Sequence, residues 1–490
     1  MSEEIGARGR SAVLDADPGG VAIGAVVADL EISRAWLVDP ASGRSGPGEI
    51  VVSNGILEAV TWLDAAEADG IDDRGVIVAP GFIDLHAHLR EPGGEDAETV
   101  ASGLAAAAHG GFTTVCAMPN TEPPADEPGV VARVRAAASS SGSPVVVLSY
   151  GAVSVGRRGE TLAAIGELAD AGVAGFSDDG TPVRGATILR QALLYAGMFG
   201  LPVVDHAEDL DQTVGAEASE GTIATILGLR GWPVSAETTA VARDLAVLVD
   251  VLADEPRARL HLTHLSTAAA IELVRVAKVA GLPVTCDVTP HHLALTDEWL
   301  AGSRRFAWEA LDATGGAGDP FADGAITAAP YDPSLRVNPP LRSATDAAAC
   351  LAGLLDGTVD AVATDHAPHT SVDKEVEFGL AANGISGIET AIGLVLEAVA
   401  ADRLPLTRAI EALTVGPAAV LGERLGRATG LVEGSAADLV VLDRSDRWVV
   451  TPDALLSRGK NSPLVGRRLP GRVLMTLAAG RLAYRDPDLD

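Results

Sequence analysis

The chain has 490 residues, of which 47% are hydrophobic and only 3% are aromatic. At roughly 100–200 residues per domain, this length suits two or three domains, unless one of them is a barrel of about 250 residues. The high hydrophobic content excludes disorder over most of the chain. Its 67 acidic residues outnumber its 36 basic ones, and the net charge of −31 argues against binding to a nucleic acid backbone.

Residues 1–20 are rich in Gly, Ala and charged residues, and we expect them to form a flexible tail. They lack the apolar core of a signal peptide, and no run of about 18 uncharged apolar residues predicts a membrane span. The three cysteines lie far apart in the sequence, which excludes a disulfide framework and a Cys-x-x-Cys zinc site. These features favour a cytoplasmic protein without a membrane partner.

Both ends of the chain are predicted to form short β-strands. Near the start these are ADLEISRAWLVDP and GEIVVSNGILEAV, the second with a Ser-Asn-Gly turn. Near the end, ADLVVLD and RVLMTLAAGRLAYR have a similar pattern. Because these segments flank a large middle region, we expect residues 21–77 and 431–490 to form one small composite β domain.

The middle region, residues 78–430, alternates short runs rich in Val and Ile with Ala-rich helical stretches. Eight such strand–helix units predict an α/β fold of the (β/α)8 barrel type. A doubly wound open sheet is the competing interpretation, which the lack of a Gly-x-Gly-x-x-Gly motif after the first strand weakens. Residues 301–336 are rich in Gly, Ala, Asp and Pro and break the alternation, so we expect a loop insertion there.

Histidines concentrate where the predicted strands end. Eight of the ten lie at or just beyond a strand's C-terminal end: His86, His88, His206, His264, His291, His292, His366 and His369. Barrel enzymes carry their active sites on this face. Because His86 and His88 are two residues apart on one strand, both side chains point to the same face and can bind one metal ion.

Carboxylates join the histidines at two strand ends. In GFSDDG, Asp178 and Asp179 point in opposite directions, so only one can face inward. In ATDHAPHT, Asp365 can ligate a metal ion or accept a proton. Combined with His206 and His264, for which a hydrogen-bonded core histidine is the alternative, this thiolate-free donor set suits Zn²⁺ or a similar divalent ion. Six ligands are more than one tetrahedral Zn²⁺ ion can bind, and two ions that share a bridging carboxylate fit this donor set better.

Together these motifs resemble the dihydroorotases of the amidohydrolase superfamily, in the long bacterial type I form. The resemblance covers about residues 23–485 and rests on PGFIDLHAHLREPG, GGFTTVCAMPNTEP, GFSDDG, DHAED, THLST, VTPHHLALTD, VNPPLRS, ATDHAPHT and GKNSP. It implies a (β/α)8 barrel with a composite β domain. It also implies the reversible, zinc-dependent cyclisation of N-carbamoyl-L-aspartate to (S)-dihydroorotate, the third step of de novo pyrimidine synthesis.

The resemblance further implies two Zn²⁺ ions per subunit. The implied ligands are His86, His88 and Asp365 for one ion, His206 and His264 for the other, and Asp179 as the bridge between them. Asp365 would also transfer the proton during catalysis. Many relatives use a carboxylated lysine as the bridge, but the first lysine of this chain is Lys278, far from the third and fourth strands. A lysine bridge is therefore excluded, and an aspartate bridge is what the type I pattern implies.

An anionic substrate is implied as well. The residues predicted to bind it are His88, Arg90, Asn120, Asn338, His369, Asn383 and Gly384. Arg90 can form a bidentate pair with a substrate carboxylate, and the alternative is a salt bridge to Glu91 or Glu98. The stretch LAANGISG lacks a proline that relatives often have there, so Asn383 and Gly384 depart from the family pattern. His291 and His292 are expected to support the end of the seventh strand.

Two other functions stay open. An allantoinase or hydantoinase uses the same barrel and metals, usually with a lysine bridge and a different substrate clamp. A non-catalytic dihydroorotase-like chain serves as a structural partner of aspartate transcarbamoylase, but such chains have lost metal ligands that are all present here. The sequence thus predicts a small-molecule substrate, with a homodimer and aspartate transcarbamoylase as candidate partners.

Overall fold

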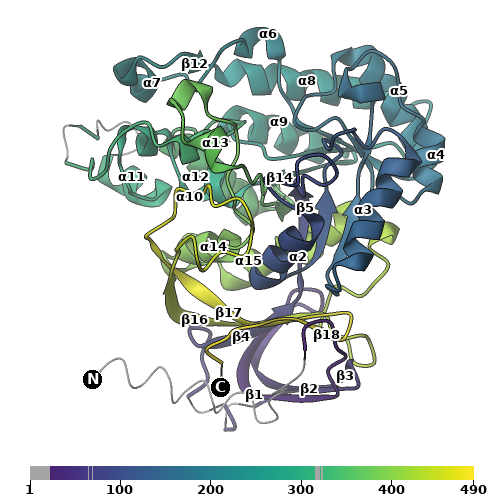
Figure 1. Cartoon of the computed structure of the whole chain (residues 1–490), viewed down its shortest axis with the longest axis vertical. Helices are drawn as coiled ribbons and strands as arrows, with labels where there is room; N and C mark the ends of the chain where they lie inside the picture. Colours follow the sequence, from purple (N-terminus) through teal and green to yellow (C-terminus); the bar gives the residue numbers. More distant parts are fainter. Residues whose placement is uncertain (1–21, 65, 69, 315–319, 322–323, 490) are drawn as a thin grey trace.

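The computed structural model describes residues 22–64, 66–68, 70–314, 320–321 and 324–489. The predicted tail, residues 1–20, lies outside the described residues, as do residues 315–319 and 322–323 of the predicted insertion. Figure 1 shows a β-sheet at one end of the molecule and a larger body of strands and helices above it. Within the described ranges, no helix combines the length and apolar character needed to cross a membrane.

The smaller part is a seven-stranded mixed sheet built from both ends of the chain (Figure 1), in the order β18-β17-β16-β4-β1-β2-β3. Its strands are β1 (Asp29–Asp39), β2 (Arg44–Ser53), β3 (Ile56–Trp62), β4 (Val76–Pro80), β16 (Leu439–Val449), β17 (Arg468–Ala478) and β18 (Arg481–Arg485). β4 pairs with β1 in parallel and with β16 antiparallel, so the two ends of the chain meet at β4.

Alternating burial explains why these segments form a sheet. Along β2, Ile50 and Val52 are buried, while Val51 and Ser53 are partly exposed. This period of two gives β2 one buried face, whereas β4 and β17 are buried at nearly every position. The buried face of β2 packs into one core with apolar residues of the C-terminal strands, such as Leu439.

The larger part contains parallel strands, which hydrogen bonds divide into two sheets, β5-β6-β7 and β15-β14-β13-β10-β9-β8. The strands are β5 (Phe82–Ala87), β6 (Phe112–Ala117), β7 (Val146–Ser149), β8 (Gly151–Ala152), β9 (Phe176–Ser177), β10 (Pro202–Asp205), β13 (Arg259–Leu262), β14 (Val284–Val288) and β15 (Ala361–Val362). Only Tyr150 separates β7 from β8, and an isolated parallel bridge joins Ala87 to His366. The α/β class is confirmed, while the ladders of the described residues do not form one closed barrel.

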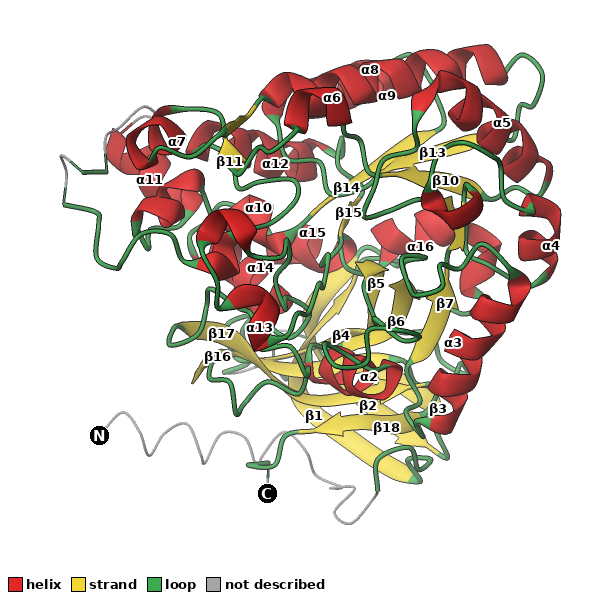
Figure 2. Ribbon diagram, turned by 45° about the horizontal axis from the view of Figure 1, so that its top comes forward, coloured by secondary structure: helices red, strands yellow, loops and turns green. Residues whose placement is uncertain are grey.

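Helices alternate with these strands, as predicted, and Figure 2 shows them on the outside of the strands. They include α2 (Val100–His109), α3 (Pro128–Ser140), α4 (Ile165–Asp170), α5 (Gly185–Met198), α8 (Val234–Val251), α9 (Ala268–Val279), α12 (Ala344–Asp356) and α14 (Ala391–Ala400). On α9, Ala270, Ile271 and Val274 are buried at helical spacing. The Thr267 side chain accepts from the Ala270 N–H and so caps the start of this helix.

Shorter elements complete the loops around the strand ends. The α-helices are α6 (Leu210–Thr213), α7 (Thr222–Leu227), α10 (Pro290–Ala294), α13 (Ser371–Lys374), α15 (Leu406–Glu411) and α16 (Val415–Leu421). The 3-10 helices are η1 (Val155–Arg157), η2 (Asp297–Ala301), η4 (Phe378–Leu380) and η5 (Gly422–Leu425). β11 (Ala218–Ser219) and β12 (Gly231–Trp232) form a separate parallel pair.

The described part of the predicted insertion is more ordered than its composition indicates. It contains α11 (Ala307–Thr314) and η3 (Pro333–Leu335). The rings of Phe306 and Trp308 stack with their centroids 5.0 Å apart, and the Arg467 guanidinium lies 4.4 Å from the Phe306 centroid. Arg467 also donates to the Arg304 carbonyl at 2.7 Å. These contacts hold the insertion against the C-terminal segment.

Candidate active site

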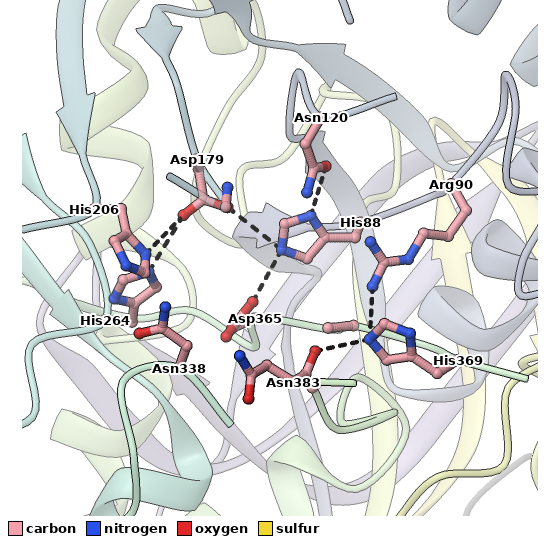
Figure 3. A pocket seen from close by; sticks show the side chains of 13 residues that line it. His88, Arg90, Asn120, Asp179, His206, His264, Asn338, Asp365, His369 and Asn383 are labelled. Atoms are coloured by element: carbon pink, nitrogen blue, oxygen red, sulfur yellow. Dashed lines mark hydrogen bonds and ion pairs between the residues drawn. The ribbon is translucent and has the colours of Figure 1, made fainter. Parts of the chain in front are cut away.

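The ends of the parallel strands surround a cavity of about 140 Å³. The residues that line it are His88, Arg90, Asn120, Asp179, Gly180, His206, His264, Asn338, Asp365, Ala367, His369, Asn383 and Gly384. One further predicted site residue, His86, is fully buried and contacts this set. Figure 3 shows the imidazole and carboxylate groups turned toward one another. The structure thus brings every predicted site residue together.

Two histidines at the end of β5 meet two carboxylates. The Nε2 atoms of His86 and His88 are 3.2 Å apart. His86 Nε2 lies 3.1 Å from Asp179 Oδ2, and His88 Nε2 lies 3.1 Å from Asp365 Oδ1. The two-residue spacing on an extended strand places both imidazoles on one face. His86, His88 and Asp365 form a group close enough to hold a metal ion.

Asp179 lies between this pair of histidines and a second pair. Its Oδ2 atom faces His86, while its Oδ1 atom is 3.3 Å from His264 Nε2 and 3.4 Å from His206 Nδ1. His206 Nδ1 and His264 Nε2 are 2.9 Å apart. His86, Asp179 and His264 form another candidate ligand group. The two oxygens of one carboxylate therefore face different sets of histidines (Figure 3).

The donor set fits a divalent metal ion. Burial opposes ionisation of Asp179, but the nearby His86 and the hydrogen bonds from His206 and His264 hold the pKa of this carboxyl well below its usual range. Burial is likewise outweighed at Asp365, where His86 and a hydrogen bond from His88 lower the pKa. Two buried carboxylates that stay ionised favour a nearby cation, and imidazole nitrogens with carboxylate oxygens suit Zn²⁺ or a similar ion.

Hydrogen-bond partners orient three of the candidate ligands through their second ring nitrogen. The pairs are His86 Nδ1 with Thr263 Oγ1 (2.8 Å), His88 Nδ1 with Asn120 Oδ1 (2.8 Å) and His206 Nε2 with Glu208 Oε2 (2.9 Å). Such contacts fix the tautomer and the orientation of a ligating ring. Thr263 stands in the motif THLST and Glu208 in DHAED, but neither was among the predicted site residues.

Two candidate ligands have a left-handed backbone, with φ 41° at His264 and 45° at Asp365. Residues other than glycine rarely adopt this conformation, so surrounding contacts must hold it. The His264 N–H donates to the buried Asp287 carboxylate at 2.7 Å, and the Thr364 N–H donates to the buried Asp84 carboxylate at 2.9 Å. Asp287 on β14 and Asp84 on β5 thus support the backbone of these candidate ligands. Asp84 stands in the motif PGFIDLHAHLREPG, whereas Asp287 stands in none of the motifs named above.

Arg90 lies at another side of the cavity, next to His369 (Figure 3). Its Nη2 atom is 3.2 Å from His369 Nε2, and its Nε–H donates to the Pro368 carbonyl at 3.1 Å. In the described part of the chain it forms no ion pair with Glu91 or Glu98, whose carboxylates accept hydrogen bonds from other groups. The alternative of a salt bridge is therefore wrong. A guanidinium without a carboxylate partner at a cavity wall can pair with an anionic ligand.

Asn338 and Asn383 form more of the wall. Asn338 Nδ2 donates to Glu208 Oε2 at 3.0 Å. The Asn383 carbonyl accepts from His369 Nε2 at 2.7 Å, and the Asn383 side-chain oxygen accepts from Arg336 Nε at 3.1 Å. The backbone of Asn383 thus lies at the cavity beside His369, while its side-chain oxygen is bound by Arg336.

Gly384 is a position that requires glycine. Its φ is 144°, and a Cβ there would lie 2.5 Å from the Ala367 Cβ and 3.0 Å from His369 Nε2. Both the backbone conformation and the lack of space exclude a side chain. The close approach lets the main chain form this part of the wall.

Other polar residues near the strand ends lie outside the candidate ligand groups. None of the lysines lines the cavity. Lys278 pairs with Asp360 on the outside, and Lys460 donates to main-chain carbonyls. His291 and His292 are buried on α10, where His292 Nε2 donates to the Pro339 carbonyl at 3.1 Å and so supports the segment that carries Asn338.

Comparisons with known proteins identify the family of this chain. Residues 75–280 match the family model described as Dihydro-orotase-like. The dihydroorotase of Anaeromyxobacter sp. (strain K) is 45% identical over 463 residues, which are 94% of this chain and 99% of that protein. The dihydroorotase of Pelotomaculum thermopropionicum is 42% identical over 93% of this chain and 99% of that protein.

Solved structures show the fold. The L-hydantoinase (dihydropyrimidinase) from Arthrobacter aurescens aligns with a TM-score of 0.74 at 24% identity, over 93% of this chain and 96% of that one. The dihydropyrimidinase from Brevibacillus agri NCHU1002 aligns with a TM-score of 0.69 at 21% identity, over 93% and 95%. Identities this low establish a shared architecture alone.

Proposed function

The chain belongs to the dihydroorotase family, and on that premise we propose that it catalyses the reversible cyclisation of N-carbamoyl-L-aspartate to (S)-dihydroorotate in de novo pyrimidine synthesis. The ureido nitrogen attacks a carboxyl carbon, a C–N bond forms and water leaves; hydrolysis of the ring amide is the reverse. The identity of 45% over 94% of the chain carries this conclusion.

We also propose that residues 78–430 form a (β/α)8 barrel, that residues 21–77 and 431–490 form a composite β domain, and that the chain is of the bacterial type I form. The barrel is supported by the chain order of the parallel strands, with helices between them, and by the bridge between Ala87 and His366. The composite domain is supported by the pairing of β4 with both β1 and β16.

Two Zn²⁺ ions per subunit are proposed for the metal centre. His86, His88 and Asp365 would hold one ion and His206 and His264 the other, with Asp179 as the shared ligand. When bound, such ions act as Lewis acids that polarise the amide carbonyl. Metal analysis of the purified protein tests the stoichiometry: we expect two zinc ions per chain, and about one per chain in Asp179→Ala.

Asp365 is proposed as the catalytic acid and base. Its carboxylate lines the cavity and is ionised, because the neighbouring histidines hold its pKa low. In hydrolysis it accepts a proton from the attacking water and delivers that proton to the leaving ring nitrogen. In cyclisation it takes the proton from the ureido nitrogen and returns it to the departing oxygen.

The remaining cavity residues are proposed to bind the substrate. Arg90, Asn120 and His369 would hold the substrate carboxylate, with His88 beside them, and Asn338 would contact the ring edge. The main chain at Asn383 and Gly384 would contact the ring from the opposite wall. The Arg90 guanidinium supplies local positive charge in a chain whose net charge is −31.

Substrate comparison tests this function against its alternatives. We expect turnover of N-carbamoyl-L-aspartate and dihydroorotate, and little turnover of allantoin or dihydrouracil. Turnover of allantoin without dihydroorotate would instead indicate an allantoinase. A purified protein without metal and without activity would indicate a non-catalytic partner of aspartate transcarbamoylase.

A cytoplasmic location and a homodimer are further proposals. The three buried, free cysteines suit a reducing compartment. Size-exclusion chromatography with light scattering tests the dimer, and co-purification with aspartate transcarbamoylase tests that partner. No nucleic acid or membrane partner is proposed for so acidic a chain.

A further inference from the structure

A buried lysine lies behind one wall of the cavity. Lys374 is the last residue of α13, and only 5% of it is exposed. Its Nζ atom donates to the main-chain carbonyls of Ala382 at 2.7 Å, Pro333 at 2.9 Å and Arg336 at 3.2 Å. An ammonium group has three N–H donors, and these three acceptors engage all of them.

The three carbonyls belong to two segments that both carry cavity residues. Ala382 directly precedes Asn383 and Gly384, and Arg336 stands two residues before Asn338. The Arg336 carbonyl also accepts from the Gly384 N–H at 2.8 Å. The lysine therefore joins the two segments at the point where each approaches the cavity.

The Arg336 side chain forms a second connection between the same segments. Its Nε–H donates to Asn383 Oδ1 at 3.1 Å, and its Nη1 donates to the Phe378 carbonyl at 2.8 Å. Arg336 is partly exposed, whereas Lys374 is buried. Both cations thus donate hydrogen bonds to the loop that carries Asn383 and Gly384.

Packing alone does not account for an amine at this position. Burial lowers the pKa of Lys374 to about 7, against the effect of Asp332, which raises it. Among the described residues no carboxylate forms an ion pair with Lys374. An apolar side chain of similar length would fill the same space without this desolvation penalty.

We propose that Lys374 is a positioning residue of the substrate pocket. By holding the carbonyls of Pro333, Arg336 and Ala382 together, it fixes Asn338 on one segment relative to Asn383 and Gly384 on the other. Lys374 does not line the cavity itself, so it acts on substrate binding through these residues. The inference rests on their proposed contacts with the substrate.

The test uses steady-state kinetics of the metal-loaded protein in both directions, with Lys374→Met as the main variant. We expect its KM to rise about 10–100-fold while kcat stays within about 3-fold, because the displaced groups bind the substrate without reacting, and loss of a hydrogen bond to a charged ligand weakens binding by about this factor. Lys374→Arg, which keeps donors and charge, should recover part of the loss. Lys278→Met, which removes a lysine from a partly exposed ion pair on α9, should leave KM and kcat unchanged.

Turnover by the wild-type protein tests the proposed function separately from this inference. With an active wild type, a folded Lys374→Met variant with unchanged KM would overturn the positioning role, as would a fall in kcat at unchanged KM. If Lys374→Met does not fold, Arg336→Met decides, since Arg336 donates to the same loop at Asn383 and Phe378. A several-fold rise in its KM at full metal content supports the inference, and an unchanged KM refutes it.

Discussion

Replacing Asp365 by asparagine separates proton transfer from the shape of the site. The left-handed backbone at this residue, with φ 45°, is one that Asn tolerates almost as well as Asp, whereas alanine would add strain. The amide keeps an oxygen near His88 Nε2, where the carboxylate now lies at 3.1 Å. It cannot accept and return a proton. The contact of Thr364 with Asp84, which holds the backbone, is untouched.

The size of the effect follows from the electrostatics of the site. A positioned acid or base contributes about 10²–10⁴-fold to the rate, and the largest values require a pKa near the working pH. His86 and His88 outweigh burial and hold the pKa of Asp365 far below that range. We therefore expect a loss in kcat near the lower end, about 10²-fold, which is about 2.7 kcal/mol of barrier.

The assay measures kcat in both directions for Asp365→Asn, alongside its metal content and thermal stability. Cyclisation and hydrolysis should fall by the same factor, since one group carries the proton both ways. A variant that keeps its metal and more than a tenth of the wild-type kcat would refute the assignment. Loss of kcat in one direction only would refute the shared role.

Gly384→Ala places a methyl group 2.5 Å from the Ala367 Cβ, so the free energy of unfolding should fall by about 2–4 kcal/mol and KM should rise. Calorimetry measures the first effect and steady-state kinetics the second. A variant as stable as the wild type would contradict the predicted strain. Arg90→Lys keeps the charge but loses the planar fork, and KM should rise about 10–100-fold; an equal KM would exclude a bidentate contact. Burial raises the pKa of Glu208, but His206 outweighs burial and lowers this pKa from 4.5 to about 2. The ionised carboxylate therefore stabilises the fold above about pH 4.5, and this stabilisation is lost as the pH falls toward 2. Glu208→Gln should flatten the decline in Tm over that range, and an unchanged decline would show that another group causes it.

The convergence of strand-end residues on one cavity could be predicted from the sequence. Parallel strands place their C-terminal ends on one face, and a spacing of two residues puts neighbours such as His86 and His88 on the same side. The supporting roles of other residues could not be predicted, although Asp84 and Thr364 stand in quoted motifs. Asp287 lies among apolar residues of β14, and its partner His264 is 23 residues away; Asp84 and Thr364 are 280 residues apart.

The middle segment 301–336 shows the same limit in the fold. Its composition predicts a loop, and no local period reveals a helix. The order there comes from Phe306 and Trp308, which stack near Arg467, and Arg467 is 163 residues away from its hydrogen-bond partner Arg304. A contact of that range leaves no pattern in a local window of sequence.

The candidate metal centre is assembled from residues that the ribosome makes at very different times. His86, Asp179 and His264 are present once the chain passes β13, whereas the contact of His88 with Asp365 spans 277 residues and waits for the segment after β15. His264 in turn takes its backbone conformation from Asp287, on the strand that follows it. A stalled or truncated chain that ends before Asp365 therefore lacks one of the two candidate ligand groups.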